Sequence, residues 1–155
     1  MCAADRESVV IRTARPEDAA AMARLSGQLG YPAEATTFAK RLTYLAARPE
    51  NGIFVAEREG AVLAWAHIAG RVLLESAPFA EVLGLIVDEA ARKQGIGASL
   101  VDACLDWART HGWQQVRVRS NVVRGDAHRF YERQGFTVSK KQVVFAMPID
   151  QDAVA

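Results

Sequence analysis

The chain has 155 residues, which suits one domain with a single core. Half of the residues are hydrophobic and 24% are charged, and a net charge of +1 excludes strong electrostatic attraction to nucleic acid or to an anionic membrane. No stretch approaches the roughly 18 apolar residues of a membrane span, and the first ten residues contain no apolar signal-peptide core. Two cysteines, Cys2 and Cys104, are too few for a disulfide framework. We therefore expect a cytoplasmic, single-domain protein with its core between about residues 9 and 149.

Apolar periodicity predicts the elements of the N-terminal half. Pro16 suits the first turn of a helix, and the acids after it lie against the positive end of the helix dipole. Arg58-Glu59-Gly60 is typical of a tight turn between two strands, and Gly70 is a candidate β-bulge in the second of them. The expected elements are, in order, a strand at 9–13, helices at 16–30 and 33–47, and strands at 52–57 and 61–75.

The C-terminal half begins with the near-continuous apolar run 81–87, which predicts a central strand buried on both faces. A helix follows at 94–110, and its inner face is expected to carry Ile96, Leu100, Cys104 and Trp107. The remaining expected elements are a strand at 116–120, a helix at 126–134, and one or two strands within 136–149. This order predicts an α/β fold with a mixed central sheet, in which strand–helix–strand units pair in parallel, flanked by about four helices.

The strongest chemical signal lies where the buried strand meets the next helix, at Arg92-Lys93-Gln94-Gly95-Ile96-Gly97. A helix N-terminus exposes unpaired N–H groups and attracts phosphate. Gly95 and Gly97 permit a close approach, while Arg92 and Lys93 add charged donors. The alternative is a flexible loop with basic residues facing water. The dinucleotide fingerprint GxGxxG is excluded because Leu100 occupies its last position, and no GK[ST] triphosphate loop occurs.

Two motifs at matching spacing resemble the GNAT superfamily of N-acetyltransferases. Arg92-x-x-Gly95-x-Gly97 is similar to its (Arg/Gln)-x-x-Gly-x-(Gly/Ala) signature. The segment 121–136 is similar to its second signature, an Asn followed by a helix that ends in Tyr-Glu-x-x-Gly-Phe. The resemblance spans nearly the whole chain, and it implies that two parallel strands splay apart around the pantetheine arm of acetyl-coenzyme A. It also implies that the following residues contact this co-substrate: Leu85, Ile86 and Val87 on the strand, Arg92, Lys93, Gln94, Gly95, Ile96, Gly97, Ala98 and Ser99 at the loop, and Asn121, Ala127, Phe130 and Arg133 downstream.

Acetyl transfer to an amine needs a neutral attacking nitrogen and a proton for the departing thiolate. Glu81, eleven residues before Arg92, matches the general-base glutamate of histone-acetylating members of the superfamily, and its apolar neighbours favour a raised pKa. The alternative is an exposed acid at a strand edge. Tyr131 matches the tyrosine that protonates the thiolate, and the alternative is an aromatic that only packs. A backbone N–H near Leu85 is the natural donor to the oxyanion.

The resemblance implies that the acceptor enters opposite coenzyme A, where acids mix with aromatics that suit a cationic amine. The residues expected there are Gln28, Leu29, Tyr31, Glu34, Trp65, His67, Glu75 and Glu81. We expect an amine-bearing small molecule or peptide as partner, with a homodimer possible and with no nucleic acid, membrane or metal involved. No convincing cysteine nucleophile occurs, so direct transfer in a ternary complex is favoured. The alternatives are a non-catalytic acyl-CoA-binding regulatory module and, against the charge balance, a nucleic-acid-binding domain.

Overall fold

The computed structural model describes residues 8–120 and 125–150. The chain divides into two compact units, and the division in the sequence falls between Arg119 and Ser120. The first unit contains β1 (Val10–Thr13), α1 (Ala19–Gly27), α2 (Ala35–Ala46), β2 (Asn51–Arg58), β3 (Ala61–Arg71), β4 (Phe79–Val87), α3 (Ile96–Thr110) and β5 (Val116–Val118). Short 3-10 helices at Pro16–Asp18 and Glu89–Ala91 precede α1 and α3. The second unit contains α4 (Gly125–Arg133).

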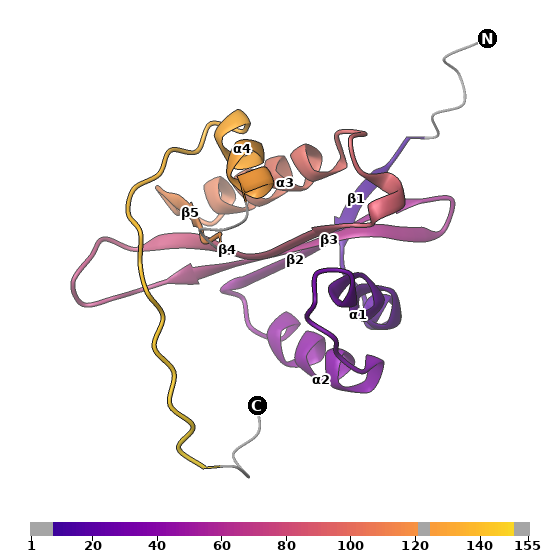
Figure 1. Cartoon of the computed structure of the whole chain (residues 1–155), viewed down its shortest axis with the longest axis horizontal. Coiled ribbons are helices and arrows are strands. Elements are labelled where there is room, and N and C mark those ends of the chain that lie inside the picture. Colours follow the sequence, from indigo (N-terminus) through magenta and orange to yellow (C-terminus); the bar gives the residue numbers. More distant parts are fainter. Residues whose placement is uncertain (1–7, 121–124, 151–155) are drawn as a thin grey trace. The chain divides into compact units, whose positions relative to one another are not determined.

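The strands of the first unit form a five-stranded mixed sheet in the order β1-β2-β3-β4-β5 (Figure 1). The first four strands pair antiparallel with their neighbours, whereas β4 and β5 are parallel. A parallel pair needs a long crossover, and α3 supplies it between these two strands. The predicted mixed sheet with a parallel strand–helix–strand unit is therefore confirmed.

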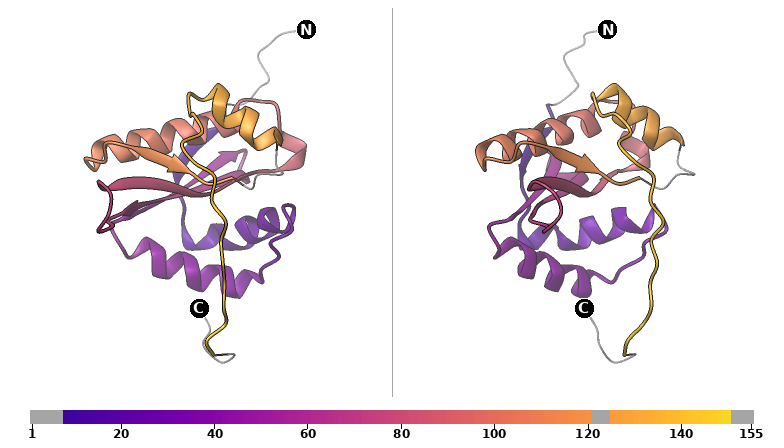
Figure 2. Two further views of the ribbon diagram at one scale, coloured as in Figure 1. Left: turned by 60° about the vertical axis from the view of Figure 1, so that its left-hand side comes forward. Right: turned by 90° about the vertical axis from the view of Figure 1, so that its left-hand side faces the viewer.

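Helices cover both faces of this sheet, with α1 and α2 on one side and α3 on the other (Figures 1 and 2). Ile96, Leu100 and Cys104 of α3 are buried against the sheet, with Trp107 packed beside them, as the periodicity of this helix predicts. On the opposite face, Met22 and Leu25 of α1 are buried together with strand residues such as Val55. No helix in the described part of the chain is long and apolar enough to cross a membrane.

Both α1 and α3 begin later than the sequence pattern predicts, for identifiable local reasons. The Asp18 carboxylate accepts the backbone N–H of Arg15 at 2.7 Å and the guanidinium of Arg12 at 2.8 Å. These bonds stabilise the 3-10 turn at Pro16–Asp18, so that α1 begins at Ala19. Gly95 has a φ of 81°, which cannot continue a right-handed helix, and α3 therefore begins at Ile96.

Gly70 is not the β-bulge that the sequence suggested. The register between β3 and β4 shifts at His67 and Ile68, whereas Gly70 pairs regularly with Ala80. What requires glycine here is a close approach, because a Cβ built at Gly70 would lie 1.9 Å from Cζ2 of Trp113. The indole ring packs against the core on the α3 face of the sheet.

Replacing Gly70 with alanine should therefore destabilise the protein. The Trp113 ring would have to leave its place in a packed core, which typically costs about 1–3 kcal/mol. Urea unfolding should show a lower midpoint with an unchanged slope. The matched control is Gly27→Ala at the end of α1, where a built Cβ meets nothing within 4 Å. Equal midpoints for the two variants would show that Trp113 moves aside without cost.

The second unit differs from the sequence prediction after α4. Residues 136–150 contain no strand, so the expectation of one or two strands within 136–149 is wrong for the described chain. Strand formation requires a hydrogen-bonding partner, and the β-branched and aromatic composition of this segment cannot supply one by itself. The large apolar side chains left exposed are Val138, Val143, Val144, Phe145, Met147 and Ile149.

Candidate active site

The loop from β4 to α3 has the geometry of an anion-binding helix start. Val87 ends β4, Asp88 caps the 3-10 helix Glu89–Ala91, and Gly95 in the left-handed region caps α3. The first N–H groups of α3 have no partner within the helix, and they lie at the positive end of its dipole. Lys93 also has a positive φ of 64°, which is an uncommon and strained conformation for a non-glycine residue. Strain of this kind persists only where the surrounding structure fixes the loop.

Helix α1 contributes to fixing this loop. The Asp88 carboxylate accepts the backbone N–H of Ala90 at 3.1 Å and the side-chain amide of Gln28 at 3.3 Å, and Arg24 lies 3.5 Å away. These contacts, the Ala90 N–H first, hold the pKa of Asp88 below its usual range. The Gln28 side chain also accepts the backbone N–H of Glu89 at 3.1 Å. Gln28, which the sequence placed in the acceptor region, thus uses both ends of its amide to brace the loop.

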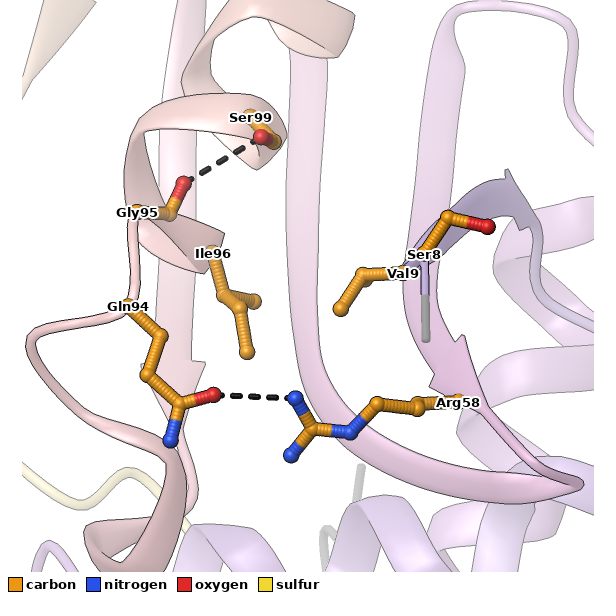
Figure 3. A pocket seen from close by; sticks show the side chains of 7 residues that line it. All are labelled: Ser8, Val9, Arg58, Gln94, Gly95, Ile96 and Ser99. Carbon is orange, nitrogen blue, oxygen red and sulfur yellow. Dashed lines mark hydrogen bonds between the residues drawn. The ribbon is translucent and has the colours of Figure 1, made fainter. Parts of the chain in front are cut away.

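A cavity of about 250 Å³ opens beside the loop (Figure 3). It is lined by Ser8, Val9 and Arg58 together with residues 94–96 and Ser99. Nη1 of Arg58 donates to Oε1 of Gln94 at 2.9 Å, and the Ser99 hydroxyl donates to the Gly95 carbonyl at 3.2 Å. Arg58 had no sequence signal as a site residue, because it lies 36 positions before Gln94.

The cations that the sequence assigned to phosphate lie in the loop itself. Nε of Arg92 donates to the Val87 carbonyl at 3.3 Å, so this guanidinium is held at the end of β4. Arg92 and Lys93 are both exposed. Arg58 adds a third cation beside the N-terminus of α3 (Figure 3). Positive charge, glycine at the helix start and an adjacent cavity together fit a phosphate-bearing group.

Strands β4 and β5 separate immediately before this loop. Their pairing runs only from Ala80 with Val116 to Val82 with Val118, so the last five residues of β4 extend past it. Leu85 and Val87 pack towards the α3 side of the sheet, while Ile86 is buried on the side of α1 and α2. The predicted splayed parallel pair is thus present. It leaves one backbone edge of β4 unpaired by β5 beyond Val82.

Glu81 is buried in the middle of the sheet, with only 3% of its surface exposed. The alternative of an exposed strand-edge acid is therefore wrong. Its surroundings also differ from the apolar ones expected: Oε1 lies 3.0 Å from Nε of Arg119, and Oε2 lies 3.7 Å from Nε of Arg71. The carboxylate is thus held between two guanidinium groups. No sequence pattern linked these two arginines to Glu81.

Burial keeps both His67 and Cys104 uncharged near neutral pH. Burial, and then the charge of Arg71, lowers the pKa of His67 to about 4, so the ring is neutral near pH 7. Its Nε2 lies 2.8 Å from Oδ1 of Asn51. Burial raises the pKa of the Cys104 thiol to about 12 and keeps it protonated in the core. Cys2 lies outside the described residues.

The remaining predicted site residues belong to the second unit. Ala127, Phe130 and Arg133 recur every three residues along α4, and Tyr131 follows Phe130. The Tyr131 ring contacts Phe130 edge-on at a centroid distance of 5.1 Å and Phe136 at 5.8 Å. Asn121 lies outside the described residues. The roles of these five residues at coenzyme A stay predictions.

Comparison with known proteins identifies the family. The model of the acetyltransferase (GNAT) family matches residues 19–136. The chain belongs to the GNAT acetyltransferase family. It is 30% identical to an aminoglycoside N(6')-acetyltransferase type 1 of Stenotrophomonas maltophilia over 92% of this chain and 95% of that protein. It is 29% identical to an uncharacterized N-acetyltransferase of Bacillus subtilis over 73% of this chain and 79% of that protein.

Solved structures of acetyltransferases share this GNAT fold. An aminoglycoside N-acetyltransferase crystallised in complex with CoA superposes with a TM-score of 0.82 at 15% identity, covering 96% of this chain and all of that one. An aminoglycoside 6'-N-acetyltransferase of Acinetobacter haemolyticus superposes with a TM-score of 0.78 at 19% identity, covering 91% of this chain and 99% of that one. The family match and the named relatives, rather than these structures, make the chain an enzyme of the N-acetyltransferase class.

Proposed function

We propose that this enzyme transfers the acetyl group of acetyl-CoA directly to a primary amine of a small molecule or peptide within a ternary complex. One observation carries the proposal: the unpaired edge of β4 leads straight into the N-terminus of α3 at Gly95. A strand edge suits the amide groups of pantetheine, and a helix N-terminus suits a pyrophosphate. Acetyl-CoA carries these two groups in series along one arm, and the cavity beside Gly95 and Arg58 fits its phosphate-bearing part.

Different residues of the chain would bind different parts of this arm. Backbone amides of residues 94–98 would hold the pyrophosphate, with Arg92, Lys93 and Arg58 supplying charge. The edge of β4 near Leu85 would bind the pantetheine amides and direct an N–H towards the developing oxyanion. Asn121, Ala127, Phe130 and Arg133 are proposed as further contacts of acetyl-CoA.

The chemical step has one bond made and one broken. The neutral amine nitrogen attacks the thioester carbonyl carbon, the carbon–sulfur bond breaks, and the acetyl group stays on nitrogen. The nitrogen loses a proton, for which Glu81 is the proposed acceptor, and the thiolate gains one, for which Tyr131 is the proposed donor. The buried, protonated thiol of Cys104 supports direct transfer over an acetyl-cysteine intermediate.

The test is thiol release from acetyl-CoA in the presence of a panel of amines, with mass spectrometry of the products. Direct transfer predicts that each active amine gains one acetyl group and that initial-rate plots for the two substrates intersect. Parallel plots, or acetylated protein without an amine present, would contradict the ternary complex. Binding of acetyl-CoA without turnover of any amine would favour an acyl-CoA-binding regulatory role instead.

Replacing Gly97 with valine tests the loop itself. The branched side chain in the first turn of α3 should obstruct the approach of the pyrophosphate to the backbone amides. Acetyl-CoA affinity measured by calorimetry should fall at least about tenfold, or roughly 1.4 kcal/mol. Gly27→Val at the end of α1 is the control, because a Cβ built at Gly27 meets nothing within 4 Å. Unchanged affinity in a folded Gly97→Val protein would remove the loop from the acetyl-CoA site.

A further inference from the structure

We propose that the acceptor amine of this enzyme carries an anionic group, a carboxylate or a phosphate, and that Arg71 and Arg119 bind that group beside Glu81. This inference rests on the proposed function and names the acceptor class for it. It also opposes the expectation from the sequence that acids in the acceptor region select a cationic molecule.

Three neighbouring strands bring the cluster together. Arg71 ends β3, Glu81 lies in β4, and Arg119 directly follows β5. Val118 is the last residue of β5 that pairs with β4, so Arg119 stands at the point where the two strands part. A ligand group bound by Arg119 would therefore border the gap in which the thioester is expected. The remainder of the same molecule can then place its amine in that gap.

The charges of the cluster do not balance. Arg117 is opposite Glu81 in the sheet register, but its guanidinium is engaged elsewhere, stacking 3.9 Å above the Phe79 ring and donating from Nε to Oε1 of Gln115 at 3.0 Å. Two guanidinium groups, those of Arg71 and Arg119, thus pair with one carboxylate, which leaves a local excess of one positive charge. One arginine would be sufficient to neutralise Glu81. The surplus cation suits an oxyanion ligand.

The carboxylate and its arginine partners differ in their exposure to solvent. The Glu81 side chain is 4% exposed, whereas those of Arg71 and Arg119 are 46% and 67% exposed. A guanidinium has five N–H donors, and a carboxylate accepts about four hydrogen bonds. Glu81 therefore cannot use all the donors of two arginines, and neither arginine donates to any other side chain of the described residues. The donors left over face solvent, where a ligand can reach them.

A polycationic acceptor fits this surface poorly. Relatives at about 30% identity include proteins named aminoglycoside acetyltransferases, whose substrates bear several ammonium groups. Such a molecule would face the outward guanidinium groups, while the one carboxylate of the cluster is buried and already paired. Like charges at close range oppose binding.

The experiment compares amines that differ only in the anionic group, namely glucosamine 6-phosphate with glucosamine, and a dipeptide with its C-terminal amide. In at least one of these pairs, kcat/KM for the anionic amine should be about tenfold or more higher than for its neutral counterpart. The difference should come mainly from a lower KM. Arg119→Gln and Arg71→Gln should each reduce that ratio several-fold. Arg109→Gln, which alters an exposed arginine paired with Asp106 on α3, should leave the ratio unchanged.

Two other outcomes would overturn the proposal. If the arginines only support Glu81, both variants would lower activity with charged and neutral amines alike and leave the ratio at its wild-type value. Faster acetylation of a polycation such as kanamycin than of either anionic amine would also exclude the assignment. Failure of the proposed function is a distinct result, since wild-type protein would then release no thiol with any amine. In that case calorimetry with the same amine pairs and variants still measures whether Arg71 and Arg119 bind the anionic group.

Discussion

Tyr131→Phe is expected to lower kcat by about tenfold to a thousandfold, the scale of a lost general acid. A phenol has a reference pKa near 10, so it holds its proton at neutral pH and can donate it when the thiolate leaves. Phenylalanine keeps the ring that packs edge-on against Phe130 and Phe136, and removes only the hydroxyl. Acetyl-CoA affinity should therefore stay close to wild type, and thermal unfolding is recorded alongside to show that the variant is folded. Steady-state kinetics with saturating acetyl-CoA and amine measure the effect.

Tyr44→Phe is the matched control for this variant. Tyr44 lies on α2, is 58% exposed, and has the guanidinium of Arg48 over its ring. Losing its hydroxyl should leave kcat unchanged. If Tyr131→Phe instead raises only KM for acetyl-CoA, the hydroxyl serves binding. Wild-type kcat in the Tyr131→Phe variant would end the general-acid assignment.

Glu81→Gln is expected to reduce kcat/KM by about a hundredfold or more near neutral pH, as for a lost general base. The size of the loss should depend on pH in a defined direction. An alkylamine has a pKa near 10, so the fraction of neutral amine rises with pH and less help from a base is needed. The ratio of wild-type to variant rates should therefore shrink as pH rises. Rate profiles from about pH 6 to pH 10 measure it.

Two features of the structure make this variant informative. Glutamine keeps the shape of Glu81 but leaves Arg71 and Arg119 without their counter-charge, so thermal unfolding must be recorded alongside the kinetics. Glu57→Gln is the control. Glu57 on β2 also pairs with an arginine, Arg12 on β1, but these strands lie towards the opposite edge of the sheet from Glu81. A variant profile that runs parallel to wild type at every pH would assign Glu81 to holding the arginines rather than to proton transfer.

The sequence by itself predicted the features that depend on neighbouring residues. The loop proposed to bind the pyrophosphate needs a strand end, a glycine and basic side chains within a few positions, and all of these are contiguous from Val87 to Gly97. The buried faces of α1 and α3 likewise follow from the helical repeat of their own residues. Local patterns carry this information because hydrogen bonds in a helix or a loop join residues close in the chain.

Predictions that needed a partner from elsewhere in the chain were less successful. The composition of residues 136–149 is typical of strands, yet the described segment has none, because a strand exists only through a second strand. The residue type of Gly70 suggests a bulge, whereas the indole of Trp113, more than 40 positions away, is what requires glycine there. In both places the deciding contact is absent from the local sequence.

The tertiary structure alone decided the surroundings of the proposed chemistry. Glu81 was expected among apolar neighbours, but Arg71 from β3 and Arg119 after β5 converge on it across the sheet. Gln28 was expected to face the acceptor, but it braces the loop at Asp88 and Glu89 from 60 residues earlier in the chain. Strand register and helix packing determine which distant side chains meet. The charged neighbours of a carboxylate such as Glu81 therefore depend on that register, and not on the residues next to it in the sequence.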